Sequence, residues 1–238
     1  HDQLTLVISG EQHGYLEPCG CSETQSGGYS RRADLLRQMT KRGFQPVALD
    51  LGGLVRRRRE QSRLKYQTML AALGDMSYAA VAVGPEDLAL GADFLLSQGD
   101  PGESDETAAR QPAAQSSRPA LLAANVRLFD SDDLPGAPVA GRLVKAGRHT
   151  IGVTAILDPG LARPLETAGA LDDVTIQPPE AVLPGVIDSL VGDGATLLVL
   201  LSHARLEKSL ALAERFPRFD LVVSAGGPED PLTENPRQ

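Results

Sequence analysis

Two cysteines, Cys19 and Cys21, are separated by a single glycine and are the only cysteines of the chain. Such a pair can close a small, strained disulfide, and strained disulfides are reduced more readily than structural ones. The two thiols could instead bind a soft metal ion such as Cu(I), with His13 as a nearby ligand. A third possibility is that they only stabilise the loop and take part in no chemistry. The sequence therefore marks Cys19 and Cys21 as redox candidates and leaves the metal-binding and structural alternatives open.

The residues that follow the cysteines would favour the reactive thiolate form. A helix is expected to begin at Ser30, and Arg31 and Arg32 come directly after it. The N-terminus of a helix carries a partial positive charge, and guanidinium groups add to it, so both would stabilise a nearby thiolate.

Four consecutive arginines form the strongest charge run of the chain: Arg56, Arg57, Arg58 and Arg59. Guanidinium groups bind carboxylates and phosphates through paired hydrogen bonds, so this run could dock an anion, haem propionates or an acidic partner. Charge runs more commonly face water, and a solvated loop leading into a helix is the competing interpretation. Four cations next to a helix N-terminus oppose the helix dipole, however, which stability alone would not favour.

Composition limits the classes of function. The chain has 238 residues, with 31 acidic residues against 23 basic ones, which makes non-specific binding to nucleic acid unfavourable. No apolar run approaches the roughly 18 residues that a membrane span needs. Hydrophobic residues make up 42% of the chain but aromatic residues only 4%. The core must therefore consist of Leu, Val, Ala and Ile, as in helices packed on buried parallel sheets.

Short apolar runs alternate with amphipathic stretches, which predicts a layered α/β fold. The predicted strands are Leu4–Ser9, Pro46–Leu51, Ala79–Val83, Ala120–Ala124, His149–Ile156, Val174–Gln177, Thr196–Leu201 and Phe219–Val223. The predicted helices are Ser30–Lys41, Ser62–Leu73, Leu88–Ser97, Pro179–Val191 and Leu206–Phe216. Arg142–Lys145 and Arg148–Val153 are expected to pair as a hairpin.

One segment interrupts this alternation. Residues 98–119 are rich in Asp, Glu, Ser, Ala, Gln, Gly and Pro and contain almost no large apolar side chain. We expect them to form a flexible polar insert within a single domain that covers residues 1–238. Because the first predicted strand follows His1 almost at once, we also expect this domain to be part of a longer chain.

Six short motifs follow one another in a fixed order. They are Gly27-Gly28-Tyr29-Ser30-Arg31, Leu49-Asp50-Leu51-Gly52-Gly53, Gly84-Pro85-Glu86-Asp87, Ala124-Asn125-Val126, Leu201-Ser202-His203 and Ser224-Ala225-Gly226-Gly227-Pro228. This order resembles the N-terminal domain of the 5′-nucleotidase (UshA-like) branch of the calcineurin-like metallophosphatases. The resemblance implies an α/β sandwich of two β-sheets flanked by helices. It also implies a site at the strand ends where two metal ions activate water for attack on a phosphate ester.

The chain departs from that family at most of the metal-binding positions. Gly53 stands where the family has the aspartate that bridges the two metal ions. Pro85 and Glu86 replace an asparagine ligand and a histidine, and Gly226 and Pro228 lie where a final pair of histidines belongs. Glycine and proline offer no side-chain ligand. The resemblance therefore implies a dimetal site that has been largely lost.

Three candidate ligands remain by the same resemblance. Glu11 replaces the first aspartate of the family, and His13 and His203 are retained. Two histidines with one glutamate form a known zinc set, so a single Zn or Mn ion could bind at this residual site. Without a bridging carboxylate we expect the chain not to act as a dimetal phosphatase. The alternative is a metal-dependent phosphoric ester hydrolase, similar to a 5′-nucleotidase, that uses the smaller set of ligands that remains.

Glu86 and Asp87 also allow a second interpretation. They could form a carboxylate pair at the edge of the site, or they could cap the helix predicted from Leu88. We expect the cap, because acidic residues at this position satisfy the free N–H groups of a helix N-terminus.

The cysteine loop adds a further resemblance. Glu17-Pro18-Cys19-Gly20-Cys21, followed by Gln25-Ser26-Gly27-Gly28, is similar to a degenerate branch of the family, some members of which accompany multihaem cytochromes. This resemblance implies an exported protein, in the periplasm or at the cell surface. It also implies a role for the Cys19–Cys21 loop in redox exchange or in docking a multihaem cytochrome or another electron-transfer protein.

Overall fold

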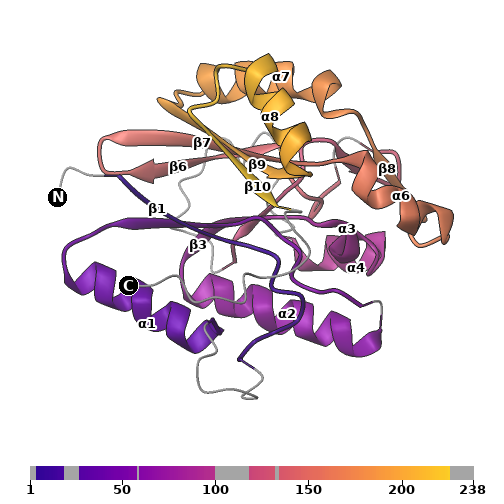
Figure 1. Ribbon diagram of the computed structural model, residues 1–238, viewed down its shortest axis with the longest axis horizontal. Coiled ribbons are helices and arrows are strands. Elements are labelled where there is room, and N and C mark those ends of the chain that lie inside the picture. Colours follow the sequence, from indigo (N-terminus) through magenta and orange to yellow (C-terminus); the bar gives the residue numbers. More distant parts are fainter. Residues whose placement is uncertain (1–3, 19–26, 58, 100–117, 132–133, 226–238) are drawn as a thin grey trace.

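The computed structural model of the chain describes residues 4–18, 27–57, 59–99, 118–131 and 134–225. These residues form four layers, in which two β-sheets are stacked face to face and helices cover both outer faces (Figure 1). The expected α/β fold of two β-sheets flanked by helices is confirmed.

The first sheet is entirely parallel and has the order β1-β2-β3-β4. Its strands are β1 (Thr5–Ser9), β2 (Pro46–Asp50), β3 (Tyr78–Ala82) and β4 (Ala120–Leu122). Its outer face is covered by α1 (Tyr29–Lys41) and α2 (Glu60–Asp75), at the bottom of Figure 1. Because all four strands run the same way, their C-terminal ends lie along a single edge.

The second sheet has the order β10-β9-β7-β6. Its strands are β6 (Gly141–Ala146), β7 (His149–Leu157), β9 (Leu197–His203) and β10 (Leu221–Ala225), and its helices are α7 (Pro179–Gly192) and α8 (Leu206–Arg215). β6 and β7 form the predicted antiparallel hairpin, whereas β9 runs parallel to both of its neighbours. A separate antiparallel pair joins β5 (Val126–Leu128) to β8 (Val174–Ile176).

Two helical regions differ from the expectation. The single helix predicted over Leu88–Ser97 is instead two helices, α3 (Pro85–Leu88) and α4 (Ala92–Gln98). Gly91 separates them, and its φ of 107° is open to glycine but strained for other residues. The second difference is α6 (Pro159–Thr167), which was not expected because prolines commonly interrupt helices. Here Asp158 caps the helix and the first proline occupies position N1, where its missing N–H is harmless.

The pleat of β2 decides which side chains face which layer. Val47 and Leu49 pack between the two sheets, whereas Ala48 packs against the helices that cover the first sheet. Successive side chains of a strand point to opposite faces. Asp50, two residues after Ala48, therefore lies on the helix side of the sheet, at the C-terminal end of the strand.

Several residues singled out in the sequence lie outside the described residues. They are Cys19, Cys21, Arg58, Gly226, Pro228 and all but the ends of the polar insert. Within the described ranges, no helix is both long and apolar enough to cross a membrane.

Candidate functional site

The C-terminal edge of the first sheet brings together the segments that the motif order predicts to be functional. The chain after β1 and the chain after β2 continue side by side beyond their strands. Their backbones are joined by hydrogen bonds from Glu11 N to Gly52 O (2.8 Å), from His13 N to Gly53 O (2.9 Å) and from Gly14 N to Leu54 O. This edge is the place where open α/β sheets bind ligands.

Asp50 is the centre of a buried polar cluster at this edge. Its carboxylate is fully buried and accepts hydrogen bonds from Ser9 Oγ and Gln12 Nε2, both at 2.5 Å, and from Gly52 N at 2.9 Å. Arg32 Nη1 lies 3.8 Å away. Burial raises the pKa of Asp50, while the hydrogen bonds from Ser9 and Gly52 and the charge of Arg32 oppose that rise. The cluster holds the ends of β1 and β2 together.

Arg32 connects this cluster to the first helix. It donates to Ser9 Oγ at 3.2 Å, and its guanidinium lies 4.9 Å from the centre of the Tyr29 ring and 6.0 Å from that of Tyr78. Tyr78 OH lies 3.1 Å from Ser9 Oγ, within hydrogen-bond distance. Arg32 is therefore engaged by the protein itself. Its contacts fix the N-terminal turn of α1, from which the cysteine loop departs.

Asp87 organises the loop that follows β2. Its fully buried carboxylate accepts four backbone hydrogen bonds: from Gly53 N at 2.8 Å, Gly84 N at 3.0 Å, Val55 N at 3.2 Å and Leu54 N at 3.3 Å. Burial raises the pKa of Asp87 to about 7 against the opposing effect of these four donors. The cap expected for a helix from Leu88 is therefore not formed: α3 begins at Pro85, its N-cap is Gly84, and Asp87 binds the N-cap N–H together with three N–H groups of the loop after β2.

His203 closes the edge from the side of the second sheet. The imidazole is only 4% exposed, and Nδ1 lies 3.0 Å from the carbonyl oxygen of Leu51. Since a carbonyl only accepts, Nδ1 must carry a proton, which leaves Nε2 with a lone pair in the neutral ring. A Cβ added to Gly84 would come within 2.9 Å of His203 Cε1, and one added to Gly53 within 3.6 Å. The ring therefore packs into space that the two glycines leave free.

The described residues of this edge do not form a group of side chains that could hold a pair of metal ions. Gly53, at the position of the bridging aspartate, has no donor side chain, and Pro85 is the first residue of α3. Of the other predicted ligands, Glu11 is exposed and His13 is half-buried. Across the described ranges, no three His, Cys, Asp or Glu side chains lie close enough to hold a metal ion. Glu11, His13 and His203 are therefore not assembled into one ligand set.

The two ends of the cysteine loop are fastened together. Tyr29 N donates to Leu16 O at 2.8 Å, and Ser30 Oγ donates to Glu17 Oε1. Gly28 has a φ of 93°, and a Cβ there would lie 2.8 Å from both Glu17 Oε2 and Pro18 Cδ. Only glycine allows such a close approach without a shift of its neighbours. Cys19 and Cys21 lie outside the described residues, but the base that carries them is well defined.

The arginine run divides into exposed and engaged members. Arg56, Arg57 and Arg59 are exposed just before α2, whereas Arg58 lies outside the described residues. Arg63 has a structural role: its Nη2 and Nε donate to Leu90 O at 2.8 and 3.2 Å, and it lies over the Phe94 ring. The exposure of these three arginines is compatible with either of the two interpretations, a docking surface or a solvated loop.

Sequence reasoning missed the residues that hold this site together. Asp50 and Asn125 both occur in the sequence motifs, but the sequence alone suggested no separate role for either residue. Asn125 is 1% exposed; it donates to Leu157 O and Gln177 O at 2.8 and 2.7 Å and accepts from Leu157 N at 2.9 Å. The available signal was a polar residue inside or directly after an apolar run, because such a residue can be buried only if it is hydrogen-bonded.

Comparison with known proteins gives matches at the level of structure alone. No family model and no curated protein sequence matches the chain. A 5′-nucleotidase precursor from Thermus thermophilus superposes with a TM-score of 0.72 at 22% identity, over 98% of this chain and 46% of that one. The NAD nucleotidase of Haemophilus influenzae gives 0.68 at 18% identity, over 95% and 38% of the two chains. The calcineurin-like phosphoesterase YfkN of Bacillus subtilis also gives 0.68, at 16% identity, over 93% and 71%.

The chain therefore has the calcineurin-like phosphoesterase fold. This is the fold that the order of sequence motifs implied. The chain spans less than half the length of both nucleotidase structures.

Proposed function

We propose that this chain is a metallophosphatase-fold module that does not hydrolyse phosphate esters by the two-metal route. Instead, its Cys19–Cys21 loop takes part in redox exchange or docks an electron-transfer partner. The observation that carries the first half of the proposal is the contact of His203 with Gly53 and Gly84. Two cations about 4 Å apart need a bridging carboxylate. Here the bridging position has no side chain and a histidine ring lies beside it.

A second candidate function rests on one feature of His203. Metal-binding histidines commonly donate their other ring N–H to a backbone carbonyl, which fixes the tautomer. His203 makes such a contact with Leu51 O at 3.0 Å. The alternative is therefore a metal-dependent phosphoric ester hydrolase that holds one Zn or Mn ion through His203, with Glu11 and His13 moving in to complete the set.

Hydrolysis of para-nitrophenyl phosphate in the presence of Mn²⁺ or Zn²⁺ separates the two candidates. We expect no metal-dependent turnover above that of the His203→Ala variant, because the donors for a metal-activated water are not assembled. His149→Ala, in the β6–β7 hairpin away from the site, is the matched control. Turnover that requires metal, is lost in His203→Ala and is kept in His149→Ala would overturn the proposal in favour of the hydrolase.

The base of the cysteine loop supports the second half of the proposal. The loop leaves α1 at its N-terminal turn, beside Arg31, whereas Arg32 is engaged with Ser9 and Asp50 and the Glu17 carboxylate accepts a hydrogen bond from Ser30 in the same turn. The helix dipole and Arg31 favour thiolates over thiols, and the Glu17 carboxylate opposes them. In the redox step, two thiolates form one disulfide and release two electrons to a partner such as a multihaem cytochrome. Reduction of the disulfide runs the other way. An exported location would bring the chain and such a partner together.

Thiol titration tests the redox role. We expect two reactive thiols after treatment with a mild reductant and none after oxidation, with Cys19→Ser and Cys21→Ser each leaving one thiol that no longer changes state. Two thiols that stay unpaired and unreactive under all of these conditions would contradict the redox role.

The exposed arginines allow a separate test of partner docking. If Arg56 and Arg57 dock the partner, Arg56→Glu with Arg57→Glu should slow electron transfer to a multihaem cytochrome at low salt and leave the thiol titration unchanged.

A further inference from the structure

The outer helical layer of the first sheet differs in charge from the rest of the chain. Residues 27–75, which include α1, β2 and α2, contain 11 of the 23 basic residues but only 4 of the 31 acidic ones, although the chain has a net charge of −8. Because α1 and α2 cover the same face of the sheet (Figure 1), these basic residues give one side of an acidic molecule a positive charge.

Two groups of exposed cations lie on this layer. The first is at the end of α1 and consists of Arg37, Lys41 and Arg42. The second comes just before α2 and consists of Arg56, Arg57 and Arg59. The end of α1 and the start of α2 lie at opposite ends of the layer (Figure 1). The positive charge is therefore spread along the layer and is not concentrated at one point.

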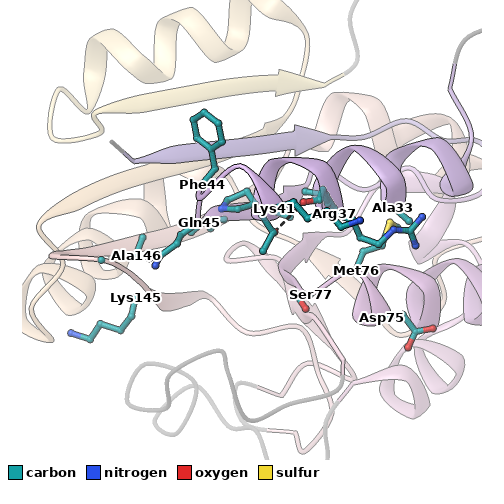
Figure 2. Close-up of a pocket in the computed structure, with 16 residues that line it drawn as sticks. Ala33, Arg37, Lys41, Phe44, Gln45, Asp75, Met76, Ser77, Lys145 and Ala146 are labelled. Carbon is teal, nitrogen blue, oxygen red and sulfur yellow. Dashed lines mark hydrogen bonds between the residues drawn. The ribbon is translucent and has the colours of Figure 1, made fainter. Parts of the chain in front are cut away.

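Acidic side chains of the layer offset only part of this charge. Asp34 lies 3.5 Å from Arg37, but both side chains are more than half exposed, so this ion pair contributes little. Glu60 lies in the first turn of α2, where a carboxylate stabilises the helix dipole. Asp75, at the end of α2, lines the same pocket as Arg37 and Lys41 (Figure 2). The two groups of cations thus keep the capacity to bind an external anionic surface.

Large apolar side chains are also exposed on this layer. Leu35 in α1 is 52% exposed, and Leu64 in α2 is 64% exposed. Tyr15, which is 65% exposed, lies close to α2, because a Cβ added to the adjacent Gly14 would lie 3.4 Å from Lys65 Cδ. Transfer of such side chains from water to an apolar phase is favourable. The layer therefore combines cations with apolar side chains that can leave water.

We propose that the layer formed by α1 and α2 binds peripherally to the surface of an anionic lipid bilayer. The exposed cations attract the lipid phosphates, which guanidinium groups bind through paired hydrogen bonds. Leu35, Leu64 and Tyr15 enter the region between the headgroups and the acyl chains, where tyrosine is commonly found. This inference does not rest on the function proposed above, since it involves neither the cysteines nor a metal ion.

The spacing of the charges favours a bilayer over an acidic protein as the partner. At about 1.5 Å per residue, the 13 residues of α1 and the 16 residues of α2 extend about 20 Å and about 24 Å. A bilayer offers a continuous anionic plane to cations at both ends of such a layer. A compact acidic patch on a protein would match only one of the two groups.

Cosedimentation of the whole chain with lipid vesicles tests this proposal. We expect binding to vesicles of phosphatidylcholine and phosphatidylglycerol but not to vesicles of phosphatidylcholine alone. Binding should be lost between about 0.1 M and about 1 M salt, because the Debye length falls from about 10 Å to about 3 Å. Lys41→Gln with Arg42→Gln should weaken binding about fivefold for each charge removed. Leu35→Ser with Leu64→Ser should also weaken it, because serine loses the apolar contact with the lipid.

Matched variants outside the layer provide the controls. Arg163→Gln with Arg218→Gln makes the same change in net charge at exposed positions, and Leu206→Ser with Leu210→Ser removes two leucines that are 56% and 55% exposed. Both pairs should leave binding unchanged. Equal binding to the two kinds of vesicle, or equal losses in the test and control variants, would overturn the proposal. Stronger retention by immobilised polyglutamate than by the anionic vesicles would also overturn it, in favour of an acidic protein. Circular dichroism of each variant establishes that a loss of binding is not a loss of fold.

Discussion

Replacement of Asp87 by alanine is expected to lower the free energy of unfolding by about 3–5 kcal/mol. The change removes the acceptor of four buried backbone N–H groups, those of Gly53, Leu54, Val55 and Gly84. Each buried donor without a partner costs about 1–3 kcal/mol, and water entering the vacated space recovers part of that cost. Urea denaturation followed by circular dichroism measures the change.

The neighbouring carboxylate provides the control for this prediction. Glu86 lies in the same short helix, is half-buried and is adjacent to Asp87 in sequence. Glu86→Ala should change the free energy of unfolding by less than about 1 kcal/mol, as surface substitutions generally do. If the two alanine variants lose equal stability, the loop after β2 is not held by Asp87.

The same residue is expected to make the stability of the protein depend on pH. Burial raises the pKa of Asp87 from its ordinary value of 3.8 to about 7. The native state then holds this proton more tightly than the unfolded chain. The free energy of unfolding should therefore fall as pH rises from about 4 to about 7 and level off above that range. Asp87→Asn should remove this contribution. A contribution that rises with pH would show that the four N–H donors outweigh burial.

Replacement of Gly52 by alanine is the second change with a large expected effect. Gly52 has a φ of 81°, and a Cβ there would lie 2.3 Å from Ala82 O and 2.9 Å from Gly84 N. All these contacts are with backbone at the strand ends, so relief would require the ends of β2 and β3 to separate. We expect a loss of at least about 3 kcal/mol, from a strained backbone together with the overlap.

Gly185 offers a control of opposite sign. It lies inside α7, and a Cβ there would meet nothing within 4 Å. Gly185→Ala should therefore stabilise the protein by about 0.5–1 kcal/mol, because alanine loses less conformational freedom in a helix. Thermal unfolding of both variants in parallel measures the contrast. Similar melting temperatures for the two variants would contradict the steric argument at Gly52.

Local patterns were sufficient to predict most of the fold. Apolar runs that end in small or polar residues predicted β1, β2, β3 and the hairpin correctly, because strands of this kind are buried on both faces. The split between α3 and α4 could not be predicted from the sequence, since a glycine such as Gly91 within a helical pattern can either be tolerated inside the helix or mark its end. Nor was α6, where Pro164 interrupts a pattern that tertiary packing nevertheless keeps helical.

The candidate site was predicted in its position but not in its contacts. Motif order placed Gly53, Pro85 and His203 at one edge, and the structure brings the segments that contain them together there. Sequence could not show that the His203 ring packs against Gly53 and Gly84, because that contact joins two different sheets. It likewise could not show that Asp50 binds the ends of β1 and β2, or that Asp87 binds the backbone of the loop after β2. A carboxylate in a motif looks the same whether it binds a ligand or a backbone amide.

The fastening of Leu16 and Glu17 to Tyr29 and Ser30 has a consequence for how this protein can change. Residues 19–26 are inserted between two points that the rest of the fold already holds in place. The entropic cost of a loop rises only by about 0.6 kcal/mol for each doubling of its length. Sequence and length between these points can therefore vary at little cost to folding.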